Sequence, residues 1–159
     1  GLIRTVGIDD AYQTPIYHVF KHYRTHLVGS KVETTVSGPS IATADIQPTI
    51  DGDAKEAHFP TETLPFVDAA AVLDSAKRIH VSLVNRSYDR TQKVEMAVPA
   101  GYAGEANWTL SHEDINATNS IEDRNRITPV SGPLKARRGK ITIEIPPCGL
   151  QVLTFTPIR

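Results

Sequence analysis

The sequence predicts an all-β fold, an antiparallel β-sandwich of jelly-roll type that is preceded by one α-helix. Apolar residues recur at helical spacing only over residues 16–27, whereas beyond Gly29 they alternate with polar residues. The eleven prolines and ten glycines among 159 residues indicate many short elements separated by turns. Together these patterns favour a sandwich built mainly after the helix.

The helix is expected over residues 16–27, with Pro15 in its first turn and Gly29 as its stop. Its apolar stripe consists of Ile16, Tyr17, Val19, Phe20, Tyr23 and Leu27. A helix ahead of an all-β unit leaves this stripe without an obvious partner. We therefore expect a C-terminal piece of a larger protein, in which a preceding segment covers the stripe.

Clear two-residue alternation predicts four strands, at residues 79–83, 94–98, 141–145 and 151–156. Weaker patterns predict three more, at residues 31–36, 66–73 and 107–111. Each strand is expected to have one polar face. Residues 38–63 and 112–139 are polar and lack an apolar period, so they are expected to run over the surface of the sandwich.

Composition excludes several classes of protein. The formal charge of −1 lacks the basic excess of a nucleic-acid binder, and no apolar run approaches the roughly 18 residues of a membrane span. The chain is therefore expected to bind neither nucleic acid nor membrane. The lone Cys148 excludes an internal disulfide and a Cys-based zinc site, and we expect it to be a small buried residue.

Three histidines, His18, His22 and His26, share one face of the expected helix. Two histidines one turn apart can bind a metal ion, and an independent metal-dependent enzyme on this face is one hypothesis. No Asp or Glu stands at a matching helical step, so a polar or partly buried face is the favoured interpretation. We expect no metal site and no cofactor.

Acidic residues cluster at three places: Asp9 with Asp10, Asp51 with Asp53, and Glu113 with Asp114. Neighbours along a strand point to opposite faces, which does not suit the paired carboxylates of a glycosidase. The Asp-Gly-Asp sequence at 51–53 lacks the downstream acid of a calcium loop. Turn chemistry is the favoured explanation for all three clusters.

Four stretches together carry a family resemblance. Residues 14–20 read Thr-Pro-Ile-Tyr-His-Val-Phe, residues 79–86 end in Val-Asn-Arg, residues 114–120 read Asp-Ile-Asn-Ala-Thr-Asn-Ser, and residues 145–153 read Ile-Pro-Pro-Cys-Gly-Leu-Gln-Val-Leu. In this order they resemble the α-L-arabinofuranosidases of glycoside hydrolase family 51. The first stretch resembles the segment that opens the last barrel helix of that family, and the other three resemble parts of its sandwich.

The resemblance implies a parent enzyme with a (β/α)₈ barrel and a C-terminal sandwich. Residues 1–29 would be the barrel tail, a loop plus the last helix, and residues 30–159 the sandwich domain. Such enzymes release terminal α-L-arabinofuranosyl groups from arabinan and arabinoxylan oligosaccharides by a retaining mechanism with two glutamates. Those glutamates belong to barrel strands that precede this segment, so no catalytic residue is assigned here.

Further expectations follow from the same resemblance. The partners are the catalytic barrel of the same protein, arabinose-containing oligosaccharides through the parent enzyme, and further copies in a homo-oligomer. No cofactor or metal is needed. A bacterial cytoplasmic location is expected, with secretion as the alternative.

The loop ahead of the helix is the part of this chain expected to approach the sugar, because barrel active sites use the loops at the carboxyl ends of the strands. Some relatives place a substrate-binding Gln there, which makes Gln13 and Thr14 the candidate substrate-binding residues. The alternative is an ordinary helix start, in which Thr14 caps the helix and Pro15 occupies its first position.

A free-standing carbohydrate-binding or protein-interaction module is the competing hypothesis. Sugar-binding sandwiches present aromatic platforms, whereas Tyr88, Tyr102 and Trp108 are scattered here and are expected to pack in the core or anchor turns. The helix distinguishes the two hypotheses. A barrel tail should expose its stripe of Tyr17, Phe20, Tyr23 and Leu27 in the isolated chain, and a complete module should bury it.

Overall fold

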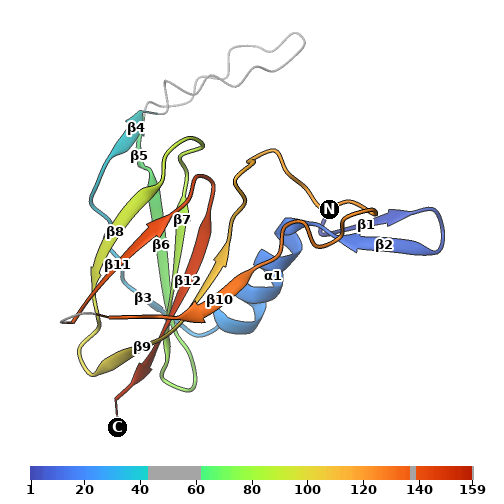
Figure 1. The fold of residues 1–159 in the computed structure, drawn as a ribbon. Coiled ribbons are helices and arrows are strands. Elements are labelled where there is room, and N and C mark those ends of the chain that lie inside the picture. Colours follow the sequence, from blue (N-terminus) through green and yellow to red (C-terminus); the bar gives the residue numbers. More distant parts are fainter. Residues whose placement is uncertain (43–61, 137–138, 159) are drawn as a thin grey trace.

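The computed structural model describes residues 1–42, 62–136 and 139–158. Within them it confirms the expected β-sandwich and its one preceding helix, α1 (Pro15–His26) (Figure 1). The described strands are β1 (Ile3–Val6), β2 (Asp10–Gln13), β3 (Ser30–Val32), β4 (Ser40–Ala42), β5 (Thr63–Pro65), β6 (Val67–Leu73), β7 (Ile79–Asn85), β8 (Gln92–Ala97), β9 (Tyr102–Leu110), β10 (Val130–Pro133), β11 (Lys140–Ile145) and β12 (Leu150–Pro157).

The main sheet has six strands in the order β10-β9-β12-β7-β6-β3, and all of its pairings are antiparallel. Strands β8 and β11 pair with each other as a second layer. The short hairpin β1–β2 and the antiparallel pair β4 and β5 complete the described strands. In Figure 1 the second layer lies on one side of the main sheet and α1 lies on the other.

The hydrophobic core lies between the main sheet and the β8–β11 layer. Val81 and Leu83 of β7 contribute to it, and Leu153 and Phe155 of the neighbouring β12 are fully buried there. Its other buried members are Val67, Ala71, Leu134, Ile141 and Ile145. Two-residue alternation places these side chains on one face of each strand, which is the pattern that the sequence predicted.

The opposite face of β7 is polar at His80 and Ser82, as expected, but it does not face solvent. His80 and Ser82 are only 1% and 3% exposed. Their cross-strand neighbours on β12 are Thr154 and Val152, and Val152 also faces Trp108 on β9. Helix α1 covers this face, so the central strand is buried on both sides.

Several strands differ from the sequence prediction. The expected strand at 31–36 is confined to Ser30–Val32, whereas the one at 107–111 belongs to the longer β9. Residues 112–139 include β10, which pairs along the edge of the main sheet with β9. Most of the expected surface stretch at 38–63 lies outside the described residues, including the acidic pair Asp51 and Asp53.

The hairpin β1–β2 projects away from the sandwich beside the N-terminal end of α1 (Figure 1). All four residues of β1 are exposed. The segment at 111–129, orange in Figure 1, runs from the sandwich to the base of this hairpin. No helix among the described residues is both long enough and apolar enough to cross a membrane.

Cys148 is exposed, so the expectation of a buried cysteine is wrong. Its backbone adopts a φ of 51°, in the left-handed region. The turn before β12 imposes this conformation, because the Cys148 amide donates to the Ser87 carbonyl and the Gly149 amide donates to the Pro146 carbonyl. At Gly149 a Cβ atom would lie 2.8 Å from that Pro146 oxygen, so the turn also needs this glycine.

Replacing Cys148 with glycine should stabilise the domain. A non-glycine residue pays roughly 1–2 kcal/mol in the left-handed region, and the greater freedom of unfolded glycine offsets part of the gain. We expect Cys148→Gly to raise the free energy of unfolding by about 0.5–1 kcal/mol, or about 2 °C in Tm. Cys148→Ala removes the thiol but keeps Cβ, and it should bring no gain in urea or thermal unfolding. Equal melting of the glycine and alanine variants would contradict the strain argument.

Candidate functional site

The segment ahead of α1 holds the two candidate substrate-binding residues in different environments. Gln13 ends β2 and is exposed, whereas Thr14 is 7% exposed. The Thr14 hydroxyl lies 3.0 Å from the carbonyl oxygens of both Gly1 and Leu2, to which it can donate its proton. Thr14 occupies the helix N-cap position without a side-chain capping bond, and Pro15 stands in the first turn.

The buried side-chain amide of Asn119 joins the segment ahead of α1 to the sandwich. Asn119 is fully buried, and its Nδ2 donates to the Gln13 carbonyl at 3.0 Å and to the Ile127 carbonyl at 3.1 Å. Its Oδ1 accepts a hydrogen bond from the Ile127 amide at 2.7 Å. Residues 106 positions apart in the sequence are thereby joined at the start of the helix.

An ion pair joins the same sandwich segment to the hairpin. Arg124 Nη2 lies 2.6 Å from Asp10 Oδ2, and Arg124 Nη1 donates to the Ala11 carbonyl at 3.3 Å. The hydrogen bond from Arg124 holds the pKa of the Asp10 carboxyl below its usual value. A cavity of about 390 Å³ lies here, and it is lined by Ile3, Ala11, Tyr12, Gln13, Arg124 and Asn125.

The histidine face of α1 packs on the outer face of the main sheet. The His22 ring stacks on Trp108 with centroids 4.2 Å apart, and His26 lies 4.5 Å from His22 and 5.8 Å from His80. The Tyr23 hydroxyl is 2.6 Å from the Ser82 hydroxyl. This geometry confirms the interpretation of a partly buried helix face.

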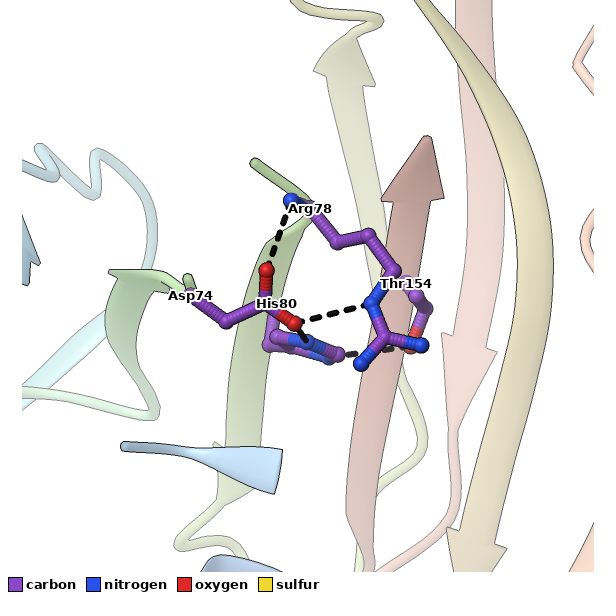
Figure 2. A network of polar contacts seen from close by, with 4 residues as sticks. All are labelled: Asp74, Arg78, His80 and Thr154. Atoms are coloured by element: carbon purple, nitrogen blue, oxygen red, sulfur yellow. Dashed lines mark hydrogen bonds and ion pairs between the residues drawn. The ribbon is translucent and has the colours of Figure 1, made fainter. Parts of the chain in front are cut away.

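Beneath the helix, His80 is fixed by a polar network with Asp74, Arg78 and Thr154 (Figure 2). Its Nε2 lies 3.0 Å from Asp74 Oδ2, and its Nδ1 lies 3.2 Å from the Thr154 hydroxyl. Asp74 also accepts hydrogen bonds from the backbone amide and the Nε of Arg78, each at 2.8 Å. Burial alone would raise the pKa of Asp74, but the hydrogen bonds from His80 and Arg78 outweigh it and hold that pKa well below its usual range.

The arrangement of the histidines bears on the hypothesis of a metal site. His22, His26 and His80 line one cavity of about 370 Å³. Within the described part of the chain, however, no group of three or more His, Cys, Asp or Glu side chains is placed to hold a metal ion. Burial, followed by the nearby His26 and His80, lowers the pKa of His22 from 6.5 to about 4. His22 is therefore neutral at pH 7.

The described acidic and aromatic residues that the sequence singled out do not form a further site with these histidines. Asp10 is paired with Arg124, and Asp114 lies 3.7 Å from Arg126, so each accompanies a surface cation. Trp108 is half-buried and its ring is covered by His22. Tyr102 packs against the core as expected. Tyr88 is 69% exposed and does not pack in the core.

Sequence reasoning missed the roles of Asn119 and Arg124. Asn119 falls inside the Asp-Ile-Asn-Ala-Thr-Asn-Ser stretch that carries part of the family resemblance, which is the one signal that singles it out. No local pattern indicates that its amide reaches Gln13. Arg124 follows in a polar stretch without any periodic signal.

Fold and site together define a β-sandwich domain with a helix on the outer face of its main sheet and a hairpin that projects from the start of that helix. The family model described as the α-L-arabinofuranosidase C-terminal domain matches residues 2–148. The chain belongs to this family. No curated protein sequence matches the chain significantly.

Solved structures of the same kind superpose on nearly the whole chain. The thermostable GH51 α-L-arabinofuranosidase from Thermotoga petrophila has a TM-score of 0.78 at 25% identity, over 97% of this chain and 31% of its own. The α-L-arabinofuranosidase from Thermotoga maritima gives 0.78 at 24% identity, with the same coverage of 97% and 31%. The family 51 enzyme from Bifidobacterium longum gives 0.75 at 21% identity, over 98% and 28%. The chain thus spans about a third of the length of these enzymes.

Acid should destabilise the domain through the helix–sheet contact. The pKa of His22 is about 4 in the folded chain, below its ordinary 6.5, so the unfolded chain takes up a proton first as the pH falls. The contribution of neutral His22 to the free energy of unfolding is complete above pH 6.5, and it is lost as the pH falls from 6.5 to 4. Burial also lowers the pKa of His26, and the lowered pKa of Asp74 extends the loss below pH 3.8.

We expect Tm to fall from pH 7 to pH 4, as measured by calorimetry. The control is His22→Phe, which keeps an aromatic ring against Trp108 but cannot titrate, so its Tm should fall less steeply over this range. Equal slopes for the two proteins would exclude His22 as the source.

Proposed function

We propose that this chain is the C-terminal, non-catalytic portion of an α-L-arabinofuranosidase that releases terminal α-L-arabinofuranosyl groups from arabinan or arabinoxylan oligosaccharides. Its task is to cover and support the catalytic (β/α)₈ barrel of the same protein and its assembly. The observation that carries the proposal is the family match over residues 2–148, together with coverage of only about a third of the related enzymes. The Thermotoga maritima structure is an arabinose complex, which supports the substrate class.

The proposal divides the chain into residues 1–29, the tail of the barrel domain, and residues 30–159, the sandwich domain. The orientation of α1 supports this division. Of the four side chains that a barrel tail should expose, Phe20 is 58% exposed, whereas Tyr17, Tyr23 and Leu27 are half-buried. No residue of α1 is fully buried, so the stripe is open in part, at Phe20 and the neighbouring Ile16. This partial exposure favours a barrel tail, whose exposed side chains the barrel would cover, over a complete module, which should bury them.

Within this proposal Gln13 and Thr14 have different tasks. Gln13 has an exposed side chain next to the cavity of about 390 Å³, which supports a direct contact with the sugar. The hydroxyl of Thr14 is occupied by the Gly1 and Leu2 carbonyls, which supports a role in shaping the segment. The expected homo-oligomeric state and bacterial cytoplasmic location belong to the same proposal.

A free-standing carbohydrate-binding module is less well supported. A sugar platform needs an open aromatic face, and the ring of Trp108 is occupied by the stacked His22. The exposed Tyr88 stands after β7 in the sequence, and no ring contact joins it to another described aromatic side chain. Among the described residues, Tyr88, Tyr102 and Trp108 therefore do not form the row of aligned aromatic rings that such modules present.

The function is tested by comparing the full-length protein with the isolated chain. We expect the full-length protein to hydrolyse an aryl α-L-arabinofuranoside, and residues 1–159 alone to show no turnover, because the two catalytic glutamates are expected on the barrel. A control with an aryl β-xyloside checks that hydrolysis is specific. Turnover by the isolated chain, or an inactive full-length protein, would contradict the proposal.

The barrel contact is tested at Phe20. In the isolated chain Phe20→Gln removes an exposed side chain and should change the free energy of unfolding by less than about 0.5 kcal/mol. In the full-length protein the ring should be covered, and the same change should cost about 2 kcal/mol or more. Lys21→Gln, an exposed neighbour, should be neutral in both. Equal effects of Phe20→Gln in the two proteins would show that the barrel does not cover this side chain.

A further inference from the structure

We propose that Asn119 is a positioning residue of the enzyme, which holds the main chain at Gln13 and thereby sets where the substrate-facing segment ahead of α1 lies. This inference rests on the proposed function. It assigns the sandwich a part in substrate binding, through a residue that does not itself touch the sugar.

The first argument is the fixed orientation of the Asn119 amide. The backbone of Ile127 donates to Oδ1 at 2.7 Å and accepts from Nδ2 at 3.1 Å. This reciprocal pair leaves the side chain one orientation, because a flipped amide would set donor against donor and acceptor against acceptor. The second Nδ2 proton is then aimed at the Gln13 carbonyl, 3.0 Å away.

The second argument is burial. Asn119 is 0% exposed, so water cannot readily replace a lost bond to Gln13. The Gln13 side chain, by contrast, is exposed. The main chain of Gln13 is therefore anchored to the sandwich, while its side chain stays free to meet a ligand.

The third argument is a second attachment from the same segment of the sandwich. Arg124 bonds to the side chain of Asp10 and to the carbonyl of Ala11, both on β2 just ahead of Gln13. Strand β1, which completes the hairpin, is exposed throughout. Asn119 and Arg124 thus supply described contacts that tie the base of an otherwise protruding hairpin to the sandwich.

Small displacements at a substrate-binding side chain have large kinetic effects, since a misplacement of about 1 Å can cost roughly a hundredfold in rate. Loss of the Asn119 bond frees the Gln13 main chain to shift. A residue that only stabilises the fold would leave the kinetics of the folded enzyme unchanged. Kinetics measured well below Tm therefore separate positioning from stability.

The chain offers a matched control in Asn85. It is 1% exposed, its Nδ2 donates to the carbonyls of Arg90, Ile145 and Pro146 at 2.7, 2.9 and 2.9 Å, and its Oδ1 accepts from the Ser87 amide at 2.9 Å. Asn85 is thus a buried asparagine with four hydrogen bonds to backbone groups, against three for Asn119. All of the Asn85 partners lie within the sandwich.

The experiment uses the full-length enzyme and an aryl α-L-arabinofuranoside. Asn119→Ala and Asn85→Ala should both lower Tm. Only Asn119→Ala should lower kcat/KM, by roughly tenfold or more and mainly through KM, while Asn85→Ala stays within about twofold of the wild type. Equal kinetics of the two variants would overturn the inference.

Arg124 supplies a second arm if Asn119→Ala fails to fold. Arg124 is a surface residue, so Arg124→Ala should fold normally and raise KM by roughly two- to fivefold, and Arg124→Lys, which keeps a cation beside Asp10, should recover part of the loss. The inference would be overturned if Arg124→Ala kept the wild-type KM and Asn119→Ala either kept wild-type kinetics or failed to fold. A wild-type enzyme without arabinofuranosidase activity would instead refute the proposed function.

Discussion

The burial of strand β7 on both faces is the constraint on which the rest of the structure depends. One face carries Val81 and Leu83 into the core, and the other carries His80 and Ser82 under helix α1. A buried polar side chain is costly unless it is hydrogen-bonded, and each of these two has a partner. Ser82 meets the hydroxyl of Tyr23, and His80 is held by Asp74 and Thr154. The polar row therefore specifies where the helix lies, as the apolar row specifies the second sheet layer.

The helix is attached at both ends by different means, and this explains how a surface element can be placed accurately. Toward its C-terminal end, His22 and Tyr23 contact Trp108 and Ser82 through stacking and a hydrogen bond. At its N-terminal end the Thr14 amide donates to the Leu2 carbonyl, and the side-chain amide of Asn119 donates to the Gln13 carbonyl. Both of these acceptors belong to the main chain. The end that carries the candidate substrate residues is thus held through its backbone.

Periodicity predicted the elements in which apolar and polar positions alternate, and it failed where the sequence carries no such alternation. The helix and strands β7, β8, β11 and β12 were located to within a few residues, because apolar and polar positions alternate there. Hairpin β1–β2 was missed, since β1 is exposed throughout and carries no burial signal. The family resemblance brought forward Gln13 and Thr14, but the bond from Asn119 spans 106 positions and leaves no trace in local sequence. Its partner is a backbone carbonyl, which every residue offers.

Helix α1 differs from an ordinary surface helix in which side chains face the sheet and which face solvent. In a self-contained domain the apolar stripe faces the core and the polar residues face water. Here His22 and His26 face the sheet, whereas Ile16 and Phe20 remain open to solvent. Neutral imidazole rings can pack against Trp108 and His80 at modest cost, because burial favours their uncharged form. Part of the apolar stripe, at Ile16 and Phe20, is thereby left available, although Tyr23 of the same stripe contacts the sheet. A helix that packs one face on the sandwich and leaves apolar side chains for another domain is suited to lie between the two.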